Sequence, residues 1–155
     1  MPGIDIEVIC QKLSTKADAN PVKQKPRKMS EERSRAISDE VDCLLQAGFI
    51  RKMFYTDWLS NPVVVKKKNS KWRVCIHFTN LNEACPKDSY PLLRIDQLVE
   101  ATAGHELLSF MNAYHKYYQI KIHPSGENKI AFTTDRGINC YKVMPFGLKN
   151  ARVTF

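Results

Sequence analysis

The amino-acid sequence predicts an α+β fold in which antiparallel hairpins are mixed with short helices. Residues 30–47 carry apolar residues at helical spacing, whereas 72–79 and 118–123 alternate apolar and polar residues as strands do. These segments do not alternate regularly between strand and helix, as they would in a doubly wound parallel sheet.

Residues 1–29 predict a flexible basic arm or linker. They are polar, rich in lysine and interrupted by Pro2, Pro21 and Pro26, and they show no sustained periodicity. We therefore expect the folded domain to cover residues 30–155.

An amphipathic helix is predicted over residues 30–47. Ser30 can cap it, and the next two residues are acidic, which the helix dipole favours at an N-terminus. Gly48 supplies a stop. Apolar residues between these ends fall on one face: Ile37, Val41, Leu44 and Leu45.

A β-hairpin is predicted next. Val63–Val65 is a β-branched run, residues 66–71 form a charged turn, and residues 72–79 alternate, with Arg73 on the face opposite Trp72. A loop with two prolines then leads to a short helix that Gly104 ends, whose shared face holds Ile95, Leu98 and Val99.

The second half predicts further strands. Glu106–Met111 is short and mostly apolar, and 118–123 alternates. Residues 129–134 and 139–144 flank Asp135-Arg136-Gly137, a plausible hairpin turn. A helix is expected to begin at Lys149.

The net charge of +8 comes from two basic clusters. Residues 21–35 and residues 61–88 each hold six basic and two acidic side chains, and the remaining residues hold twelve of each sign. Such clusters suit a polyanion such as nucleic acid. A solvated linker plus a lysine-rich turn explains the charge equally well.

Cysteine and hydropathy patterns restrict the class of protein. The five scattered cysteines form no C-x-x-C pair and show no zinc-ligand spacing with the four histidines, so we expect idle thiols in a reducing compartment. No apolar run reaches the length of a membrane span, and no signal pattern begins the chain. We expect an intracellular protein without a membrane partner.

Three sequence runs carry a resemblance to a known family. The first reads KWRVCI at 71–76 and CPKDSYP at 85–91, and the second reads FMNAY at 110–114 and YYQI at 117–120. The third reads AFTT at 131–134 and YKVMPFGLKNA at 141–151. In this order and spacing they resemble the fingers and first part of the palm of gypsy-type LTR-retrotransposon reverse transcriptases.

The resemblance implies a partial right-hand polymerase fold and RNA-directed DNA synthesis with a template–primer of RNA or DNA, dNTPs and two Mg²⁺ ions. Carboxylates hold such ions. The family's first palm aspartate corresponds to Asn112, whose amide is neutral and directs donors at the metal. We expect the family's Asp-Asp hairpin, and the remaining palm, thumb, connection and RNase H portions, beyond Phe155. We therefore expect this chain by itself to be catalytically inactive.

The resemblance also implies nucleotide-binding positions. Arg73 corresponds to an arginine over the triphosphate, Lys67 lies on the fingertip turn, and Tyr117 corresponds to the aromatic gate against the ribose 2′-hydroxyl. The loop under the nucleotide and template corresponds to Phe146 and Gly147. Each of these positions has an alternative interpretation. Arg73 could be an exposed strand arginine, the turn with Lys67 an ordinary solvated turn, and Tyr117 a core tyrosine. Expected contacts to nucleic acid are Lys66, Lys68, Lys71, Trp72 and Lys149.

Several positions depart from the family pattern. His115 and Lys116 replace a pair of small residues near the triphosphate, and His77 and Asn80 stand at positions that are usually acidic. Scattered changes with intact periodicity are typical of a decaying, pseudogene-like copy of an element.

Three functional hypotheses follow. The chain is an inactive reverse transcriptase domain by descent, a non-catalytic nucleic-acid-binding remnant, or an unstable product. In the second case Lys66–Lys71 and residues 21–35 would contact phosphates, and Trp72 or Tyr117 would stack on bases. In the third, the missing palm strands would leave an open sheet edge.

Overall fold

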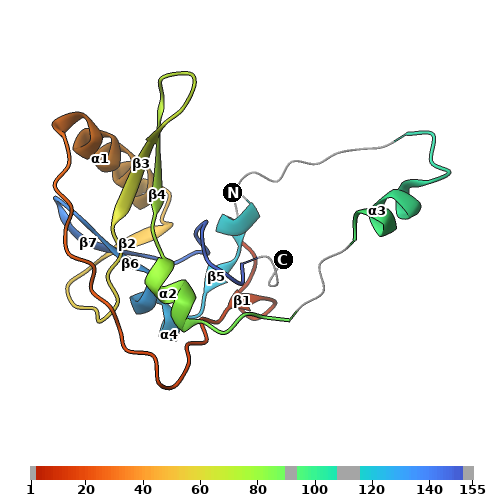
Figure 1. Ribbon diagram of the computed structural model, residues 1–155, viewed down its shortest axis with the longest axis horizontal. Coiled ribbons are helices and arrows are strands. Elements are labelled where there is room, and N and C mark those ends of the chain that lie inside the picture. The colour runs from red at the N-terminus through yellow and green to blue at the C-terminus, as the bar shows by residue number, and fades with distance from the viewer. Residues whose placement is uncertain (1–2, 90–93, 108–115, 152–155) are drawn as a thin grey trace.

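The structure of the chain is a computed structural model that describes residues 3–89, 94–107 and 116–151 (Figure 1). It confirms the predicted α+β fold. In chain order the elements are β1 (Cys10–Gln11), α1 (Glu31–Gln46), β2 (Ile50–Met53), β3 (Pro62–Lys66), β4 (Trp72–Ile76), α2 (Thr79–Ala84), α3 (Ile95–Thr102), the 3₁₀ helix η1 (Lys116–Gln119), β5 (Lys121–Ile122), α4 (Pro124–Glu127), the 3₁₀ helix η2 (Asn128–Ile130), β6 (Ala131–Thr134) and β7 (Gly137–Tyr141).

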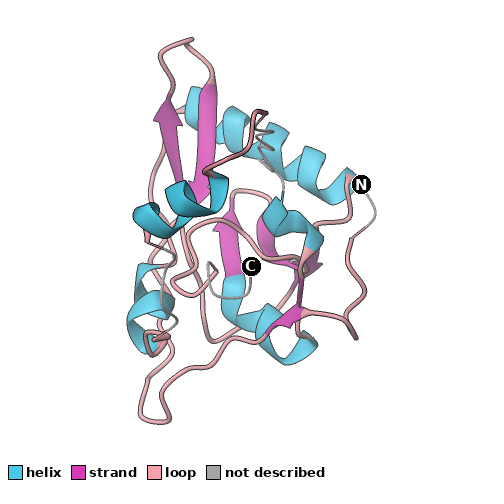
Figure 2. Cartoon of the chain, turned by 90° about the vertical axis from the view of Figure 1, so that its right-hand side faces the viewer, coloured by secondary structure: helices cyan, strands magenta, loops and turns pink. Residues whose placement is uncertain are grey.

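Helix α1 confirms the predicted helix over 30–47. Ser30 occupies the N-cap position with extended backbone, although its side chain makes no capping hydrogen bond. Ile37, Val41 and Leu44 are buried, as the apolar face predicted. Gly48 has a φ of +71°, a conformation that glycine adopts without steric cost. Figure 2 shows α1 lying beside the hairpin of β3 and β4, which it contacts.

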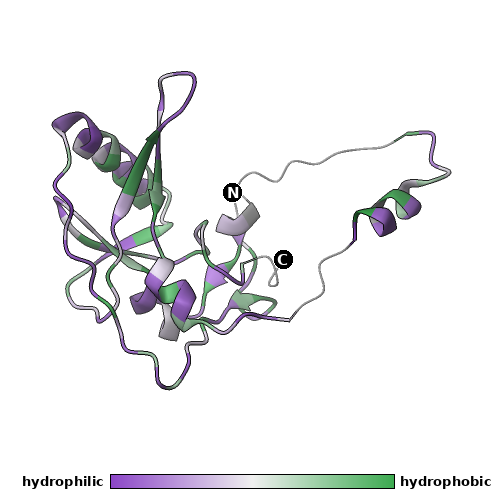
Figure 3. Ribbon diagram, viewed as in Figure 1, coloured by the Kyte–Doolittle hydropathy of each residue, from purple (hydrophilic) through white to green (hydrophobic). Residues whose placement is uncertain are grey.

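The predicted first hairpin is formed by β3 and β4. Their antiparallel register runs from the Pro62–Ile76 pair to the Lys66–Trp72 pair. The turn is closed by a 2.8 Å hydrogen bond from the Lys67 amide to the Lys71 carbonyl. Figure 3 shows apolar residues along both strands and hydrophilic residues at the turn, which stands away from the body in Figure 1.

A three-stranded antiparallel sheet in the order β2-β7-β6 forms the centre of the fold. The β6–β7 pair confirms the predicted second hairpin, with Thr134 opposite Gly137. Phe132 and Cys140, which lie on these strands, are 2% and 0% exposed. Burial of such side chains from water is the main stabilising contribution to the fold.

The predicted strand over 118–123 is wrong. The chain forms η1 up to Gln119, and only Lys121–Ile122 is a strand, paired in parallel with β1. In a strand Tyr117 and Tyr118 would point to opposite faces. Here both rings pack on Phe146, with centroids 5.0 Å and 5.9 Å away. The alternation of apolar and polar residues over 118–123 is too short to exclude a helical turn. The turn allows both tyrosine rings to contact Phe146.

Three further predicted elements lie next to, or partly outside, the described residues. The helix predicted around residues 95–99 is confirmed as α3. Of the predicted strand Glu106–Met111, residues 106–107 are not in a strand and the rest lies outside the described residues. Residues 149–151 form turns, and the remainder of the helix predicted there also lies outside them.

The predicted arm lies along the body and has little regular structure (Figure 1). Lys16 donates its amide to the Ala84 carbonyl at 2.9 Å. The Gln24 side chain donates to Asn80 Oδ1 at 2.8 Å and accepts from the Asn61 amide at 2.9 Å. Whether the arm and residues 30–155 are separate domains stays a prediction. No helix in the described part of the chain is long and apolar enough to cross a membrane.

Candidate functional site

A cavity of about 250 Å³ lies where the first hairpin faces α1 and the loop after β7. We call it the hairpin cavity. Charged, aromatic and small apolar side chains line it, and they come from segments that are far apart in the sequence. The lining residues are Glu40, Lys67, Trp72, Arg73, Val74, Cys75, Ile76, Tyr118, Tyr141, Pro145 and Phe146. Of the predicted site residues, the structure thus brings Lys67, Trp72, Arg73 and Phe146 together.

The two cations of the hairpin cavity have no anionic partner in the part of the chain that the structure describes. Lys67 and Arg73 are exposed, and among the described residues neither side chain forms an ion pair or a hydrogen bond. Arg73 pairs with Val65 across the hairpin, so its backbone position is fixed by the β-ladder. A guanidinium held this way is available for a phosphate or carboxylate ligand.

Trp72 is anchored to the body of the protein. Its indole Nε1 donates to Glu32 Oε1 on α1 at 3.1 Å. Lys66 Nζ lies 5.5 Å from the centroid of the indole ring, at the range of a cation–π contact. Lys66 and Trp72, two predicted nucleic-acid contacts, therefore also stabilise the hairpin at the end that carries the turn.

The loop that carries Phe146 has a backbone that requires glycine. Gly147 has a φ of +94°, and a Cβ there would lie 3.7 Å from the Ile76 carbonyl oxygen. The Gly147 carbonyl accepts from Asn82 Nδ2 at 2.7 Å. Tyr117 packs edge-on against Phe146. The predicted residues Tyr117, Phe146 and Gly147 thus meet, although only Phe146 lines the hairpin cavity.

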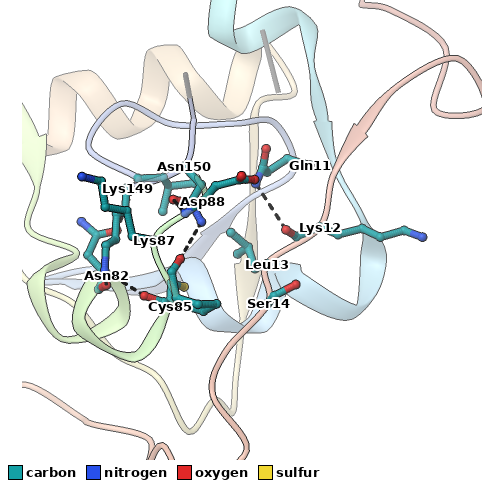
Figure 4. A pocket seen from close by; sticks show the side chains of 12 residues that line it. Gln11, Lys12, Leu13, Ser14, Asn82, Cys85, Lys87, Asp88, Lys149 and Asn150 are labelled. Carbon is teal, nitrogen blue, oxygen red and sulfur yellow. Dashed lines mark hydrogen bonds between the residues drawn. The ribbon is translucent and has the colours of Figure 1, made fainter. Parts of the chain in front are cut away.

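A second cavity, of about 330 Å³, lies between the arm and the loop after Gly147. We call it the arm cavity, and Figure 4 shows its lining residues. Lys149 Nζ donates to the carbonyls of Cys85 and Asn82 at 2.9 Å and 3.2 Å. Asn150 Nδ2 donates to the Pro86 carbonyl at 2.9 Å. The ammonium of Lys149, predicted as a nucleic-acid contact, is engaged by these internal carbonyls.

The hairpin cavity also contains polar residues that the sequence analysis missed, among them Tyr141 and Glu40. Tyr141 is 6% exposed and packs on Phe132, with ring centroids 5.4 Å apart. Burial raises the pKa of Tyr141, and Tyr118, Glu40 and Cys75 raise it further. Glu40 belongs to the solvent side of α1. A strand tyrosine and a helix-surface glutamate gave no signal of a site, because only folding brings them together.

The remaining predicted residues are partly outside the described chain. Asn112 and His115 lie there, and Lys116 begins η1. Lys68 and Lys71 are exposed on the hairpin turn and do not line the cavity. Within residues 3–89, 94–107 and 116–151 no cluster of three or more Asp, Glu, His or Cys residues could hold a metal ion. Asn112, the position that the resemblance assigns to a Mg²⁺ ligand, is not among these residues, so the described part of the chain shows no site for the two implied ions.

Comparison with known proteins decides the family. Residues 65–155 match the family model described as reverse transcriptase (RNA-dependent DNA polymerase), which is more than half of the chain. The chain belongs to the reverse transcriptase family. This reverse transcriptase domain is 31% identical over 121 residues to the Transposon Tf2-3 and Tf2-7 polyproteins of Schizosaccharomyces pombe. That match covers 77% of this chain but 9% of either polyprotein.

Solved structures show the same fold for the reverse transcriptase domain. The native prototype foamy virus protease–reverse transcriptase matches with a TM-score of 0.74 and 20% identity, over 92% of this chain and 19% of that one. A foamy viral protease–reverse transcriptase in complex with double-stranded DNA matches with a TM-score of 0.68 and 16% identity, over 95% and 25%. Together with the polyprotein relatives, they identify a reverse transcriptase domain of an LTR-retrotransposon polyprotein.

Proposed function

We propose that this domain is the fingers and first part of the palm of a gypsy-type RNA-directed DNA polymerase, and that its hairpin binds the incoming nucleotide. One observation carries the proposal: the hairpin cavity unites the unpaired cations Lys67 and Arg73 with the aromatic Phe146. A triphosphate needs fixed cationic donors, and a base or sugar needs flat apolar surface beside them.

The exposed turn of the hairpin supports a contact with the template–primer. Lys66, Lys67, Lys68 and Lys71 surround this turn, and basic residues on one protrusion attract a phosphate backbone. The purified chain should bind a DNA–RNA duplex at low salt, with affinity falling steeply as salt rises. Binding that is absent at low salt, or that does not change with salt, would contradict this contact.

We further propose that Asn112 impairs catalysis. Two divalent ions require carboxylate oxygens, and the neutral amide of asparagine removes one negative charge from their site. His115 and Lys116 stand where the family has small residues, and their bulk would hinder approach of a triphosphate to the backbone.

The test is primer extension with a fused enzyme. This chain is joined to the remaining palm, thumb, connection and RNase H portions of an active gypsy-type reverse transcriptase, with either Asn112 or Asn112→Asp. We expect synthesis with Asn112→Asp to exceed that with Asn112 by at least a hundredfold, since metal ligands supply several kcal/mol of transition-state stabilisation. A third fusion with small residues at 115 and 116 measures their contribution. Equal synthesis with and without Asn112→Asp would show that the emphasis on this position is wrong.

A second candidate is a nucleic-acid-binding domain without catalysis. The observation that favours it is an exposed basic turn in a described region that holds no carboxylate cluster. Fusions that bind duplex with salt dependence, yet synthesise nothing with Asn112→Asp and small residues at 115 and 116, would support it over the polymerase.

A further inference from the structure

Tyr141 lines the hairpin cavity and has an unused hydroxyl. The residue ends β7, the central strand of the sheet, and only 6% of its surface is exposed. Its ring packs on Phe132, with the ring centroids 5.4 Å apart. Among the described residues, no group is hydrogen-bonded to the Tyr141 hydroxyl.

This hydroxyl is not sealed in the core, and the residue that carries it lines the hairpin cavity. Asn61 Oδ1 is the single fully covered side-chain atom without a partner in the described chain, so the unpaired Tyr141 oxygen still has access to solvent. Tyrosine hydroxyls that are mostly buried usually have a hydrogen-bond partner, because desolvation without one is costly. A ligand in the cavity would supply that partner.

The charges around the cavity are divided by element. Lys67 and Arg73 belong to the hairpin, whereas Glu40 comes from α1 and acts electrostatically on Tyr141. A phosphate is attracted to the two cations and repelled by the carboxylate. Since burial raises the pKa of Tyr141, its hydroxyl stays protonated and donates. The surroundings of Glu40 and Tyr141 therefore suit the uncharged part of a ligand whose phosphates lie against Lys67 and Arg73.

We propose that Tyr141 is a specificity-determining residue, whose hydroxyl donates a hydrogen bond to the nucleoside part of a nucleotide that places its phosphates against Lys67 and Arg73. This inference rests on the proposed nucleotide-binding function. It adds that the cavity contacts the nucleoside as well as the phosphates, and that Tyr141 of the central sheet makes the contact with the nucleoside.

The test compares two ligands on the chain and on its Tyr141→Phe variant. Deoxythymidine triphosphate and inorganic tripolyphosphate are titrated separately without added metal, and dissociation constants are measured by NMR chemical-shift changes. Tyr55→Phe is the matched control, because Tyr55 is 91% exposed and lies outside the cavity. We expect Tyr141→Phe to lower the affinity for deoxythymidine triphosphate roughly three- to tenfold, which corresponds to the net contribution of one hydrogen bond. Tripolyphosphate affinity should change less than twofold.

Two further measurements separate a binding role of the Tyr141 hydroxyl from a structural one. They are the melting temperature of Tyr141→Phe and the tripolyphosphate affinity of Glu40→Gln. Tyr141→Phe retains the ring and removes a hydroxyl that has no partner in the free protein, so its melting temperature should not fall. Glu40→Gln should strengthen tripolyphosphate binding about twofold, because it removes a repulsive charge. Tyr55→Phe should change neither dissociation constant.

Three outcomes would overturn the inference. Unchanged deoxythymidine triphosphate affinity in Tyr141→Phe would show that the Tyr141 hydroxyl makes no hydrogen bond to the nucleoside. The proposed nucleotide-binding function would not be affected by that result. Equal loss of both ligands with a lower melting temperature would show a structural role for the hydroxyl. Failure of the wild-type chain to bind either ligand would instead overturn the proposed function, and this inference with it.

Discussion

The two cavities of this chain differ more in their hydrogen bonding than in their size. The arm cavity is the larger, about 330 Å³, yet Lys149 and Asn150 within it bond to backbone carbonyls of residues 82–86. The hairpin cavity is about 250 Å³, and its cations Lys67 and Arg73 have no partner among the described residues. Internal bonds that are already made stabilise the fold, whereas unmade ones are available to a ligand.

Two basic residues to which the resemblance assigned binding roles, Lys149 and Arg73, therefore have different surroundings in the structure. Lys149 holds the loop after Gly147 against the end of α2, and thereby positions Phe146 for the hairpin cavity. Among the described residues, Arg73 is held through its backbone pairing in β4 and has no side-chain partner. We infer that Lys149 and Asn150 serve the fold, whereas Lys67 and Arg73 are available to a ligand.

The largest expected effect comes from Arg73→Ala. The affinity for tripolyphosphate should fall more than tenfold, because a charge-assisted contact contributes about 1.5–3 kcal/mol. The free energy of unfolding should change by less than about 0.5 kcal/mol, since the side chain is exposed and forms no ion pair or hydrogen bond with the described residues. NMR titration and chemical denaturation measure the two quantities.

Arg136→Ala is the control for Arg73→Ala, because Arg136 is exposed in the turn between β6 and β7, pairs with Asp42 and does not line the hairpin cavity. It should leave tripolyphosphate affinity unchanged. Equal tripolyphosphate affinity in Arg73→Ala and Arg136→Ala would show that Arg73 contributes no phosphate contact.

A smaller effect, on stability only, is expected for Lys149→Met. The variant keeps much of the side-chain volume but leaves the Cys85 and Asn82 carbonyls without their donor, so the free energy of unfolding should fall by about 1–2 kcal/mol. Lys12→Met is the matched control, because Lys12 lines the same cavity with an exposed side chain. Urea denaturation should separate the two variants. Equal stability would contradict the structural role of Lys149.

The smallest contrast is expected between two thiols. Cys75 lines the hairpin cavity and is half-buried, whereas Cys85 lines the arm cavity, is buried, and has its pKa raised by that burial. A raised pKa leaves less thiolate at pH 8. Iodoacetamide should therefore alkylate Cys85 at a rate at least about fivefold lower than that of Cys75. Deoxythymidine triphosphate should protect Cys75 alone.

Mass spectrometry of digested peptides measures each alkylation rate in the same sample. Exposed Cys43 serves as the internal reference for reagent and time. Faster labelling of Cys85 than of Cys75 would show that the arm cavity is the more open of the two.

Sequence patterns predicted the elements in which several local signals agree. In α1 the cap position, acidic first turn, apolar face and stop glycine coincide, and both hairpins have a turn between β-rich strands. Residues 118–123 offered only alternation over a few positions. Contact of both Tyr117 and Tyr118 with Phe146 favoured the helical turn.

The sequence by itself determined the family resemblance and the α+β class, because these depend on residue type and spacing along the chain. Through that resemblance it also predicted nucleotide-binding roles for Lys67, Arg73 and Phe146, which stay predictions. Only the tertiary structure decided that Lys149 bonds to internal carbonyls and that Glu40 and Tyr141 line the same cavity as Arg73. The physical reason is that hydrogen bonds and charge interactions depend on distances in space. Such distances between remote segments exist only after the sheet and hairpin have packed.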